Sequence, residues 1–491
     1  MAVGLAVLWP LAHVLLGMTT ASLAVLGRAT TWALLGRTLL SCLEVTATTV
    51  VLGVPLGAVF ARGRIPARRV WLALHALPLF LPPFVIALGW FHWLGERGLV
   101  GSARTSAVLF GPVGHLLVLT TTFTPIVTAL TMLGMTGLDA SLEEAALLVA
   151  PPWRVLTRLL VPAARSRIAV AAIIVFSLTL SEVGVPMFLR VPVYGAAVFV
   201  RLGGVDFAPG EAASLGVPMV VLGFVLIGLE RALASSHGAL RLRWRTRDPM
   251  DLGAWPGVMT IFAGLFASAP LLALAVRAVP GMGRCWSWAG PSMANSLVVS
   301  GAAAAIAMGI ALIAGHALAR GSLWASALDR VTVTGFFLPS AVLGTGIIAG
   351  WNRPATQRLY GSLAIVIVGF VARYTALGTR IVAASIANTS RAYEDAGSLG
   401  GAGYFRQLAR IVIPLHAREL VAAFGIAMVF GLRDLETAVL FYPPGGETLT
   451  VRIFTLEANG PSSVVAALAL LQVILSLAVV TLGAIVMKRL R

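Results

Sequence analysis

Long apolar segments, separated by short polar ones, follow one another along the whole chain. Segments of about 20 apolar residues are long enough to cross a bilayer as helices. The apolar stretches are continuous and do not alternate with polar positions, so they do not fit the strands of a transmembrane barrel. We therefore predict an all-α polytopic membrane protein with about twelve transmembrane helices. In chain order these lie near residues 2–20, 38–61, 70–94, 106–134, 168–189, 213–232, 253–277, 294–319, 331–351, 361–385, 418–440 and 462–487.

The two halves of the chain repeat one another. Short motifs recur at a separation that drifts from 258 to 251 residues, as small deletions in a duplicated unit would produce. Each half begins with a helix running in the same direction, so the repeats are parallel and enclose a pathway between them. We expect a first unit at 1–232, an Arg-rich linker at 233–252 and a second unit at 253–491. The matching motifs are Ala61-Arg62 with Ala319-Arg320, Phe80-Leu81-Pro82 with Phe337-Leu338-Pro339, Pro162 with Pro414, and Val200-Arg201 with Val451-Arg452.

Prolines interrupt the third predicted helix of each half, at Pro82-Pro83 and at Pro339-Ser340. Breaks shared by both halves suit a gate on the pathway. Proline is also common in membrane helices that have no such function. Both interpretations of the two breaks stay open at this point.

The distribution of basic residues predicts the orientation. The chain carries a formal net charge of +17 with only 11% charged residues, whereas soluble proteins carry about 25%. With the N-terminus inside, the inner loops and the tail hold 23 of the 36 basic residues and the outer loops hold 12, which leaves Arg373 within a span. Basic residues gather on the cytoplasmic side, where they meet anionic lipid headgroups. Both termini and the linker are therefore predicted in the cytoplasm, with membrane lipid as a partner.

The sequence also argues against three other features: nucleic-acid binding, a cleaved signal peptide and a metal site. No basic stretch forms a soluble domain that could read a groove, so we expect no nucleic-acid binding. The apolar run at 2–18 lacks a charged leading segment and is interpreted as a first membrane helix rather than a cleaved signal. The histidines show no i, i+4 pairing, which predicts no metal site and no cofactor.

Two polar loops at equivalent positions, 139–166 and 388–418, interrupt the apolar pattern. Each contains acidic residues, then Gly or Pro, and ends in Arg, three aliphatic residues and Pro. In the second loop, the acidic residues lie near the positive N-terminal end of a short predicted helix, and Phe405, Leu408 and Ile411 predict one apolar stripe. A short helix, a turn and an amphipathic segment are typical of a docking device. One such loop would equally fit an ordinary connection between helices, but two at matched positions favour docking.

These loops resemble the cytoplasmic signature of inner-membrane permeases of binding-protein-dependent ABC importers: E-A-A, three residues, G, nine residues, I-x-L-P. The second loop fits in spacing, with Asp in place of Glu and Gly in place of the second Ala. The first is one residue shorter and has Val149-Ala150 where Gly is expected. The resemblance implies two fused type I permease units. It also implies that the loops couple to ATPase subunits through Glu143, Glu144, Ala145, Ala146, Pro162, Glu394, Asp395, Ala396, Gly397, Gly401, Ile411 and Pro414.

The same resemblance implies the partners, namely two ABC ATPase subunits and an extracytoplasmic substrate-binding protein in a bacterial inner membrane. We expect the second loop to make the stronger ATPase contact, because it keeps the glycine break. Stretches such as Leu435-Glu436-Thr437 and Ser181-Glu182-Val183 further resemble fused ferric-iron uptake permeases. That branch implies ferric iron as cargo. Related branches carry thiamine, 2-aminoethylphosphonate or polyamines, so the cargo stays open.

Glu182 and Glu436 occupy equivalent positions near the outer ends of their helices. Ionisable groups inside a membrane are costly and are therefore functional candidates. Together with Arg201 and Arg452, they are candidates for residues that face the pathway or the binding protein. The alternative is that the two glutamates lie at headgroup depth or pair with neighbouring arginines.

The chain itself is not expected to be an enzyme. A Walker A loop needs G-x-x-x-x-G-K-[ST], and the single lysine, Lys488, ends the last predicted span. ATP hydrolysis is therefore expected in separate subunits. A proton-coupled secondary transporter also has twelve spans in two parallel repeats and is the main rival, but it has no reason to carry the matched loops. A membrane-embedded enzyme is the third class, and no catalytic constellation points to one.

Overall fold

The computed structural model describes residues 2–136, 140–203, 207–235 and 249–490. Residues 236–248 of the predicted linker, and residue 139 of the first predicted loop, lie outside this described part. The helices of the first half are α1 (Ala2–Leu16), α2 (Thr20–Leu23), η1 (Ala24–Gly27), α3 (Ala29–Arg62), α4 (Arg68–Ala76), η2 (Leu77–Phe80), α5 (Pro83–Leu94), α6 (Ala103–Leu109), α7 (Pro112–Thr136), α8 (Ala140–Val149), α9 (Pro152–Val155), η3 (Leu156–Leu160), α10 (Val161–Ala163), α11 (Arg165–Ser181), α12 (Gly184–Phe188), α13 (Tyr194–Gly203) and α14 (Pro209–Ser235).

The second half contains a corresponding series. Its helices are α15 (Trp255–Ala278), η4 (Val279–Arg284), α16 (Cys285–Ala289), α17 (Ser292–Ala319), α18 (Leu323–Phe337), α19 (Ser340–Trp351), η5 (Pro354–Thr356), α20 (Gln357–Tyr360), α21 (Leu363–Ala387), α22 (Ala392–Leu399), α23 (Tyr404–Gln407), η6 (Leu408–Val412), α24 (Ile413–Leu415), α25 (Ala417–Arg433), α26 (Ala438–Phe441), α27 (Leu449–Glu457) and α28 (Ser462–Arg489).

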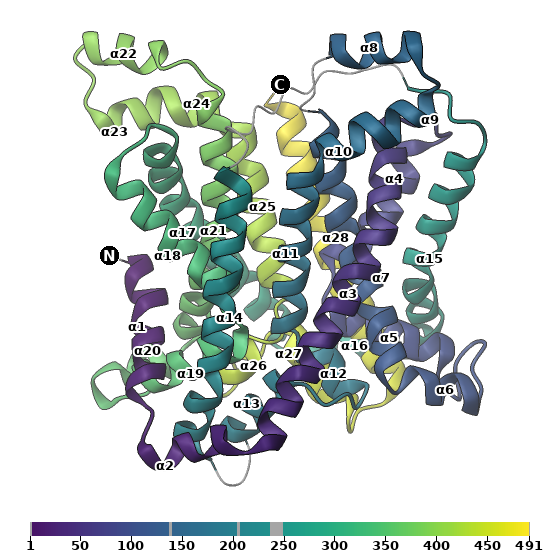
Figure 1. The fold of residues 1–491 in the computed structure, drawn as a ribbon. Helices are drawn as coiled ribbons and strands as arrows, with labels where there is room; N and C mark the ends of the chain where they lie inside the picture. Colours follow the sequence, from purple (N-terminus) through teal and green to yellow (C-terminus); the bar gives the residue numbers. More distant parts are fainter. Residues whose placement is uncertain (1, 137–139, 204–206, 236–248, 491) are drawn as a thin grey trace.

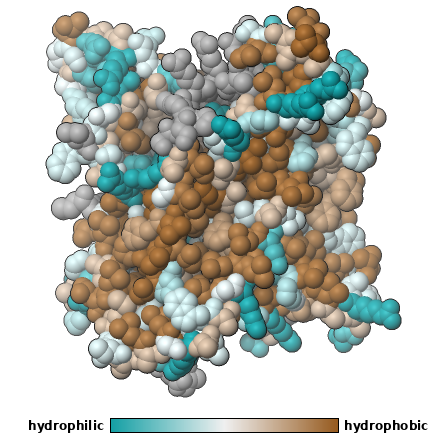
Figure 2. All heavy atoms as spheres, in the orientation of Figure 1, coloured by the Kyte–Doolittle hydropathy of each residue, from teal (hydrophilic) through white to brown (hydrophobic). Residues whose placement is uncertain are grey.

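Membrane-spanning helices dominate the fold, as predicted. Among the described residues, seven helices are long and apolar enough to cross a membrane, and counting five bent helix pairs as one span each brings the number to as many as twelve. In Figure 2 a band of hydrophobic residues crosses the middle of the visible face, with hydrophilic residues gathered above and below it. The prediction of an all-α polytopic membrane protein is confirmed.

Two of the predicted spans, 70–94 and 331–351, are not single helices. The chain bends by 109° between η2 and α5 and by 107° between α18 and α19. Leu81 and Leu338, the residues before Pro82 and Pro339, are extended, with ψ of 152° and 129°. Proline disfavours the helical conformation of the residue that precedes it. The predicted breaks are confirmed, and each is a near right-angle turn rather than a kink within a helix.

The two halves interlock. Helix α1 packs on α18 and α19, and α15 packs on α4 and α5, so the first helix of each half lies against the other half. In Figure 1, α8 and α22 lie at one end of the molecule and α2 and α6 at the opposite end. We call these ends the loop face and the far face.

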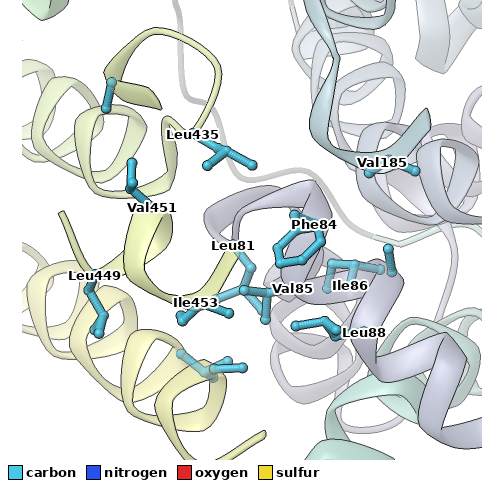
Figure 3. Close-up of a cluster of buried hydrophobic side chains, with 14 of the residues drawn as sticks. Leu81, Phe84, Val85, Ile86, Leu88, Val185, Leu435, Leu449, Val451 and Ile453 are labelled. Carbon is cyan, nitrogen blue, oxygen red and sulfur yellow. The ribbon is translucent and has the colours of Figure 1, made fainter. Parts of the chain in front are cut away.

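An apolar cluster joins the halves near the far face. Figure 3 shows Leu81, Phe84 and Val85 of the first half beside Ile453 of α27 in the second. The rings of Phe84 and Phe454 meet edge-on with centroids 5.1 Å apart. Because these side chains are buried and interdigitate, the far-face end of the boundary between the halves is closed.

Candidate functional site: two loops and a central pathway

The second loop is anchored to the helix bundle by Glu394 of α22. Its carboxylate accepts hydrogen bonds from Arg320 Nε and from His316 Nε2, each at 3.0 Å. Burial alone would raise the pKa of Glu394, but the hydrogen bonds and charges of Arg320 and His316 outweigh burial and lower it. A lowered pKa means that the anchor is present above the ordinary glutamate value and is lost only as the pH falls through the lowered one.

The first loop carries a corresponding anchor. Arg62 donates a hydrogen bond to Glu143 of α8, and the Glu143 side chain is only 2% exposed. Arg62 and Arg320 are the matched residues of the repeat, at the ends of α3 and α17. The same arginine therefore holds the loop helix in each half. Sequence reasoning found both arginines and both glutamates but did not join them, although complementary charges at matched positions were a usable signal.

The second acid of each loop points away from the bundle. Glu144 and Asp395 are exposed, as are Ala145 and Ala396. Each loop helix therefore has an acid that anchors it, buried in the first loop and partly buried in the second, and, one residue later, an exposed acid. Of the predicted coupling residues, Glu143 and Glu394 belong to the anchors. Glu144 and Asp395 lie on the outer surface of α8 and α22.

Exposed apolar residues surround these acids. On the first loop, Leu148 is 88% and Val149 84% exposed; on the second, Leu399 is 92% and Phe405 75% exposed. Large apolar side chains on a loop, well away from the apolar band, indicate a protein-binding surface. Of the predicted apolar stripe Phe405–Leu408–Ile411, only Leu408 is buried; the other buried residue of that segment is Val412, one helical turn later.

The turns of the two loops differ in construction. In the second, Gly401 has φ +75° and the amide of Ala402 donates to the carbonyl of Gly397 at 2.9 Å, which ends α22. In the first, the amide of Ala150 donates to Ala146 at 3.0 Å, and Pro151, extended at ψ 150°, leads into α9. In the first loop, Pro151 thus ends the loop helix, as Gly401 does in the second loop. The first loop is one residue shorter.

Packing explains the glycine at position 397, and proline chemistry explains the π-helical segment that precedes Pro162 and Pro414. A Cβ on Gly397 would lie 2.6 Å from Ile411 Cδ1, so glycine allows α22 to approach η6 closely. Segments η3 and η6 are π-helical and run directly into the helices that contain Pro162 and Pro414. Proline lacks an N–H and its ring clashes with the carbonyl four residues earlier, and the wider π-helical turn accommodates both effects.

A large cavity lies between the halves on the loop-face side. It has a volume of about 1010 Å³ and reaches the second loop at Asn388 and Thr389. We call this cavity the vestibule. Arg380 crosses the boundary between the halves at its wall, with ion pairs to Glu230 of α14 at 3.2 Å and to Asp329 of α18 at 2.8 Å.

A small charged cavity of about 20 Å³ continues the vestibule toward the far face. The same helices line both: on α11, Ile174 faces the vestibule and Leu178 the small cavity. On α25, Ile426 and Phe430 take the same two positions. A further small cavity follows beyond it, and Glu436 lines both small cavities. The three cavities follow one another toward the apolar cluster of Figure 3.

Glu182 and Glu436 both line the small charged cavity. Each follows the end of its helix, α11 or α25, where the predicted spans 168–189 and 418–440 break off. Glu182 Oε1 accepts a hydrogen bond from the amide of Val185 at 2.9 Å. Both are buried, 5% and 8% exposed. The expectation that they face the pathway or the binding protein remains a prediction.

Two arginines accompany the pair, and both come from the second half. Arg373 donates to Thr437 Oγ1 at 2.8 Å and lies 3.5 Å from Asp434. Tyr374 Oη donates to Asp434 Oδ2 at 2.5 Å. Arg433 was assigned to an outer loop from the sequence, and this is wrong. It is 5% exposed, with its guanidinium over the Phe430 ring at 5.1 Å.

Arg201 and Arg452 lie apart from the carboxyl pair. Arg201 forms an ion pair with Glu211 at 2.8 Å, and Arg452 forms one with Glu447 at 3.4 Å. Both arginine side chains are about one third exposed. Neither lines the three cavities, which leaves the far-face surface as their place.

Comparison with known proteins places these features in a transport class. Residues 307–491 match the family described as binding-protein-dependent transport system inner membrane component. The chain is 22% identical over 403 residues to the putative ferric transport system permease protein FbpB 1 of Haemophilus influenzae, covering 74% of this chain and 63% of that protein. It is 21% identical over 442 residues to the ferric transport system permease protein FbpB of Actinobacillus pleuropneumoniae, covering 82% and 64%.

A shorter and more similar match lies elsewhere. Over 146 residues, 29% of this chain, the sequence is 30% identical to the putative 2-aminoethylphosphonate transport system permease protein PhnV of Salmonella paratyphi A, of which it covers 55%. The chain thus spans between about half and two thirds of the length of these relatives. Residues 307–491 thus match the inner-membrane component family of binding-protein-dependent transport systems, and most of the chain is similar to ferric transport system permease proteins.

Proposed function

We propose that this protein forms the translocation pathway of an ABC importer, built from two permease units at 1–232 and 253–491. Two separate ATPase subunits bind α8 and α22, and an extracytoplasmic binding protein delivers cargo at the far face. The loop face is then cytoplasmic, with both termini on that side of a bacterial inner membrane. The recurrence of α11 and α25, each of 17 residues, and of the π-helical η3 and η6, each of five, supports the two units.

The observation that carries this proposal is the pair of matched loops on one face. Each has a helix held to the bundle by an Arg–Glu pair and exposes large apolar side chains, led by Leu148 and Leu399. A connection that only joined two spans would not need a buried anchor or an apolar outer surface. Two such surfaces at repeat-related positions fit two copies of one partner.

The cavities support a transport cycle. The vestibule lies on the loop face while apolar packing closes the far face, which corresponds to an inward-facing state. ATPase closure on ATP would draw α8 and α22 together and favour the outward-facing state. Such a shift needs the ATPase to bind the two states with different affinity. The right-angle breaks at Pro82 and Pro339 lie beside the closed end and are the proposed hinges of the gate.

Ferric iron is the proposed cargo, because the relatives that align along most of the chain are ferric permeases by name. 2-Aminoethylphosphonate is the second candidate, supported by the more similar but shorter match. The small cavities are too narrow to recognise a whole cargo molecule in this state. Recognition is therefore assigned chiefly to the binding protein.

Charge reversal on the exposed acids tests the proposal. We expect Glu144→Arg and Asp395→Arg each to reduce co-purification of the ATPase subunit with the full-length permease, while the anchors at Glu143 and Glu394 stay intact. Glu96→Arg, an exposed glutamate between α5 and α6 near the far face, is the matched control. Undiminished ATPase assembly in both loop variants would overturn the assignment. Transport that persists without ATPase subunits and stops with a proton ionophore would favour a secondary transporter instead.

A further inference from the structure

The vestibule wall carries two charged residues of opposite sign at matched positions of the repeat. Arg167 is the third residue of α11 and Glu419 is the third residue of α25, and both line the vestibule. They are 252 residues apart, as are Pro162 and Pro414 in the loops that precede them. The two halves therefore present an arginine and a glutamate to one cavity at the same place in the fold.

One face of each of these helices follows the cavities toward the far face. On α11 this face continues from the arginine to Ile174 and Leu178, and on α25 it continues from the glutamate to the matched residues Ile426 and Phe430. These positions lie about two and three helical turns after the charged residue, so they share its side of the helix. In Figure 1, α11 and α25 pass through the middle of the molecule. In parallel repeats, matched faces that border one cavity lie on opposite sides of the axis that relates the repeats.

Neither charged residue has an ionic partner in this state. The Arg167 side chain donates a hydrogen bond to the backbone carbonyl of Leu133 on α7, and no carboxylate of the described residues forms an ion pair with it. The Glu419 side chain forms neither a hydrogen bond nor an ion pair within the part of the chain that the structure describes. By contrast, Arg380 and Glu230 on the same wall are paired at 3.2 Å. Arg167 and Glu419 are half-buried, so each loses part of its hydration without the compensation of a partner.

We propose that Arg167 and Glu419 form an ion pair that closes the vestibule when ATP binding draws the two halves together. Their attraction strengthens as the approaching walls expel water, because the effective dielectric constant falls. A guanidinium group has five N–H donors, so Arg167 can keep its bond to Leu133 while it binds Glu419. The pair stabilises only the state with a closed vestibule and therefore shifts the equilibrium toward that state. The proposal rests on the proposed function, since the ATPase subunits supply the movement.

Cross-linking tests whether the two positions meet. The sample is the full-length permease with its ATPase subunits in lipid nanodiscs, carrying Arg167→Cys and Glu419→Cys. Cys42→Ser and Cys285→Ser remove the two native thiols. With a non-hydrolysable ATP analogue, a short bifunctional thiol reagent should join the introduced cysteines about tenfold faster than without nucleotide, because the closed state becomes the main population.

Charge reversal tests whether the charges themselves close the vestibule. With the native thiols removed, Ala384→Cys on the vestibule wall reports closure through protection of its thiol from a hydrophilic maleimide. Glu419→Arg places two arginines opposite one another, so half-maximal protection should need about tenfold more of the ATP analogue, because facing like charges repel. The exchange of Arg167→Glu together with Glu419→Arg should restore the wild-type requirement. Arg165→Glu, which changes an exposed arginine outside the vestibule lining, is the matched control and should behave as the wild type does.

The outcomes separate the ion pair from the transport cycle. If Glu419→Arg closes as readily as the wild type, or if the charge exchange stays as defective as the single reversal, Arg167 and Glu419 do not pair. Equal cross-linking rates with and without the analogue would lead to the same conclusion. A wild-type vestibule that stays open with the analogue, in samples that contain the ATPase subunits, would overturn the proposed transport cycle and the ion pair with it.

Discussion

The two loops solve one mechanical problem with different chemistry. Both attach a short helix to the bundle through an arginine at matched positions, Arg62 and Arg320. The first buries its acid almost completely, with Glu143 at 2% exposure, whereas Glu394 is 15% exposed and also binds His316. The first turns through Pro151, and the second through Gly401. Both loops therefore share the Arg–Glu anchor, whereas the turn can be made either by the glycine of the signature or by proline.

The largest effect is expected at the first anchor. Arg62→Ala removes an ion pair whose carboxylate is only 2% exposed, and breaking a buried ion pair costs about 3–5 kcal/mol. Hydrogen exchange of the α8 amides should accelerate accordingly, while the amides of α7 stay protected. Unchanged protection of α8 would show that Arg62 does not hold this loop.

The second anchor should be weaker. In Arg320→Ala, Glu394 keeps His316 and is nearer to water, so the loss is that of a hydrogen bond to a charged group, about 1.5–3 kcal/mol. The α22 amides should exchange faster than in the wild type, but by a smaller factor than the α8 amides of the Arg62 variant. A larger effect at Arg320 than at Arg62 would reverse the comparison.

The exposed apolar residues test which loop dominates binding. Leu148→Asp and Leu399→Asp should each weaken ATPase binding by tenfold or more, because a central apolar contact is worth about 2 kcal/mol. We expect the Leu399 change to weaken it more, since the second loop is closer to the family signature. Titration of the ATPase subunit onto the nanodisc-embedded permease measures both. Dominance of the first loop would refute this ranking.

The smallest effect concerns the turns. No heavy atom lies within 4 Å of a Cβ at Gly401, so Gly401→Ala changes only the backbone strain at φ +75°, about 1–2 kcal/mol. Ala150→Gly in the first loop should bring no gain, because Ala150 does not have a positive φ. Hydrogen exchange of the backbone amides that follow each turn measures the effect of the two substitutions. Stabilisation by Ala150→Gly would mean that the first loop does need a glycine break.

Much of this arrangement was predictable from the sequence, and the reasons differ by feature. Apolar periodicity and length predict the spans, because the bilayer imposes them directly. Proline chemistry predicts the breaks at Pro82 and Pro339. The repeat offset matches Glu182 with Glu436 and so anticipates a related position. It could not anticipate that both line one cavity, because the approach of the two halves depends on the packing of helices far apart in the chain.

The errors have equally physical causes. Arg433 was assigned to a loop because a charged residue at the end of an apolar run usually faces water, whereas Phe430 and Phe123 enclose its guanidinium. Phe405 was placed on one apolar stripe with Leu408 and Ile411 from helical spacing alone. The π-helical segment that follows it shifts the buried face to Leu408 and Val412. An exposed phenylalanine there is better explained by a partner than by the fold.

The central claim is that two ATPase subunits bind at once, one at each loop. Native mass spectrometry of the full-length permease, released from its native membrane with the ATPase that co-purifies, counts them directly. We predict two ATPase subunits on the wild type, one on Glu144→Arg or Asp395→Arg alone, and none on the double variant. Two subunits retained on the double variant would contradict the account.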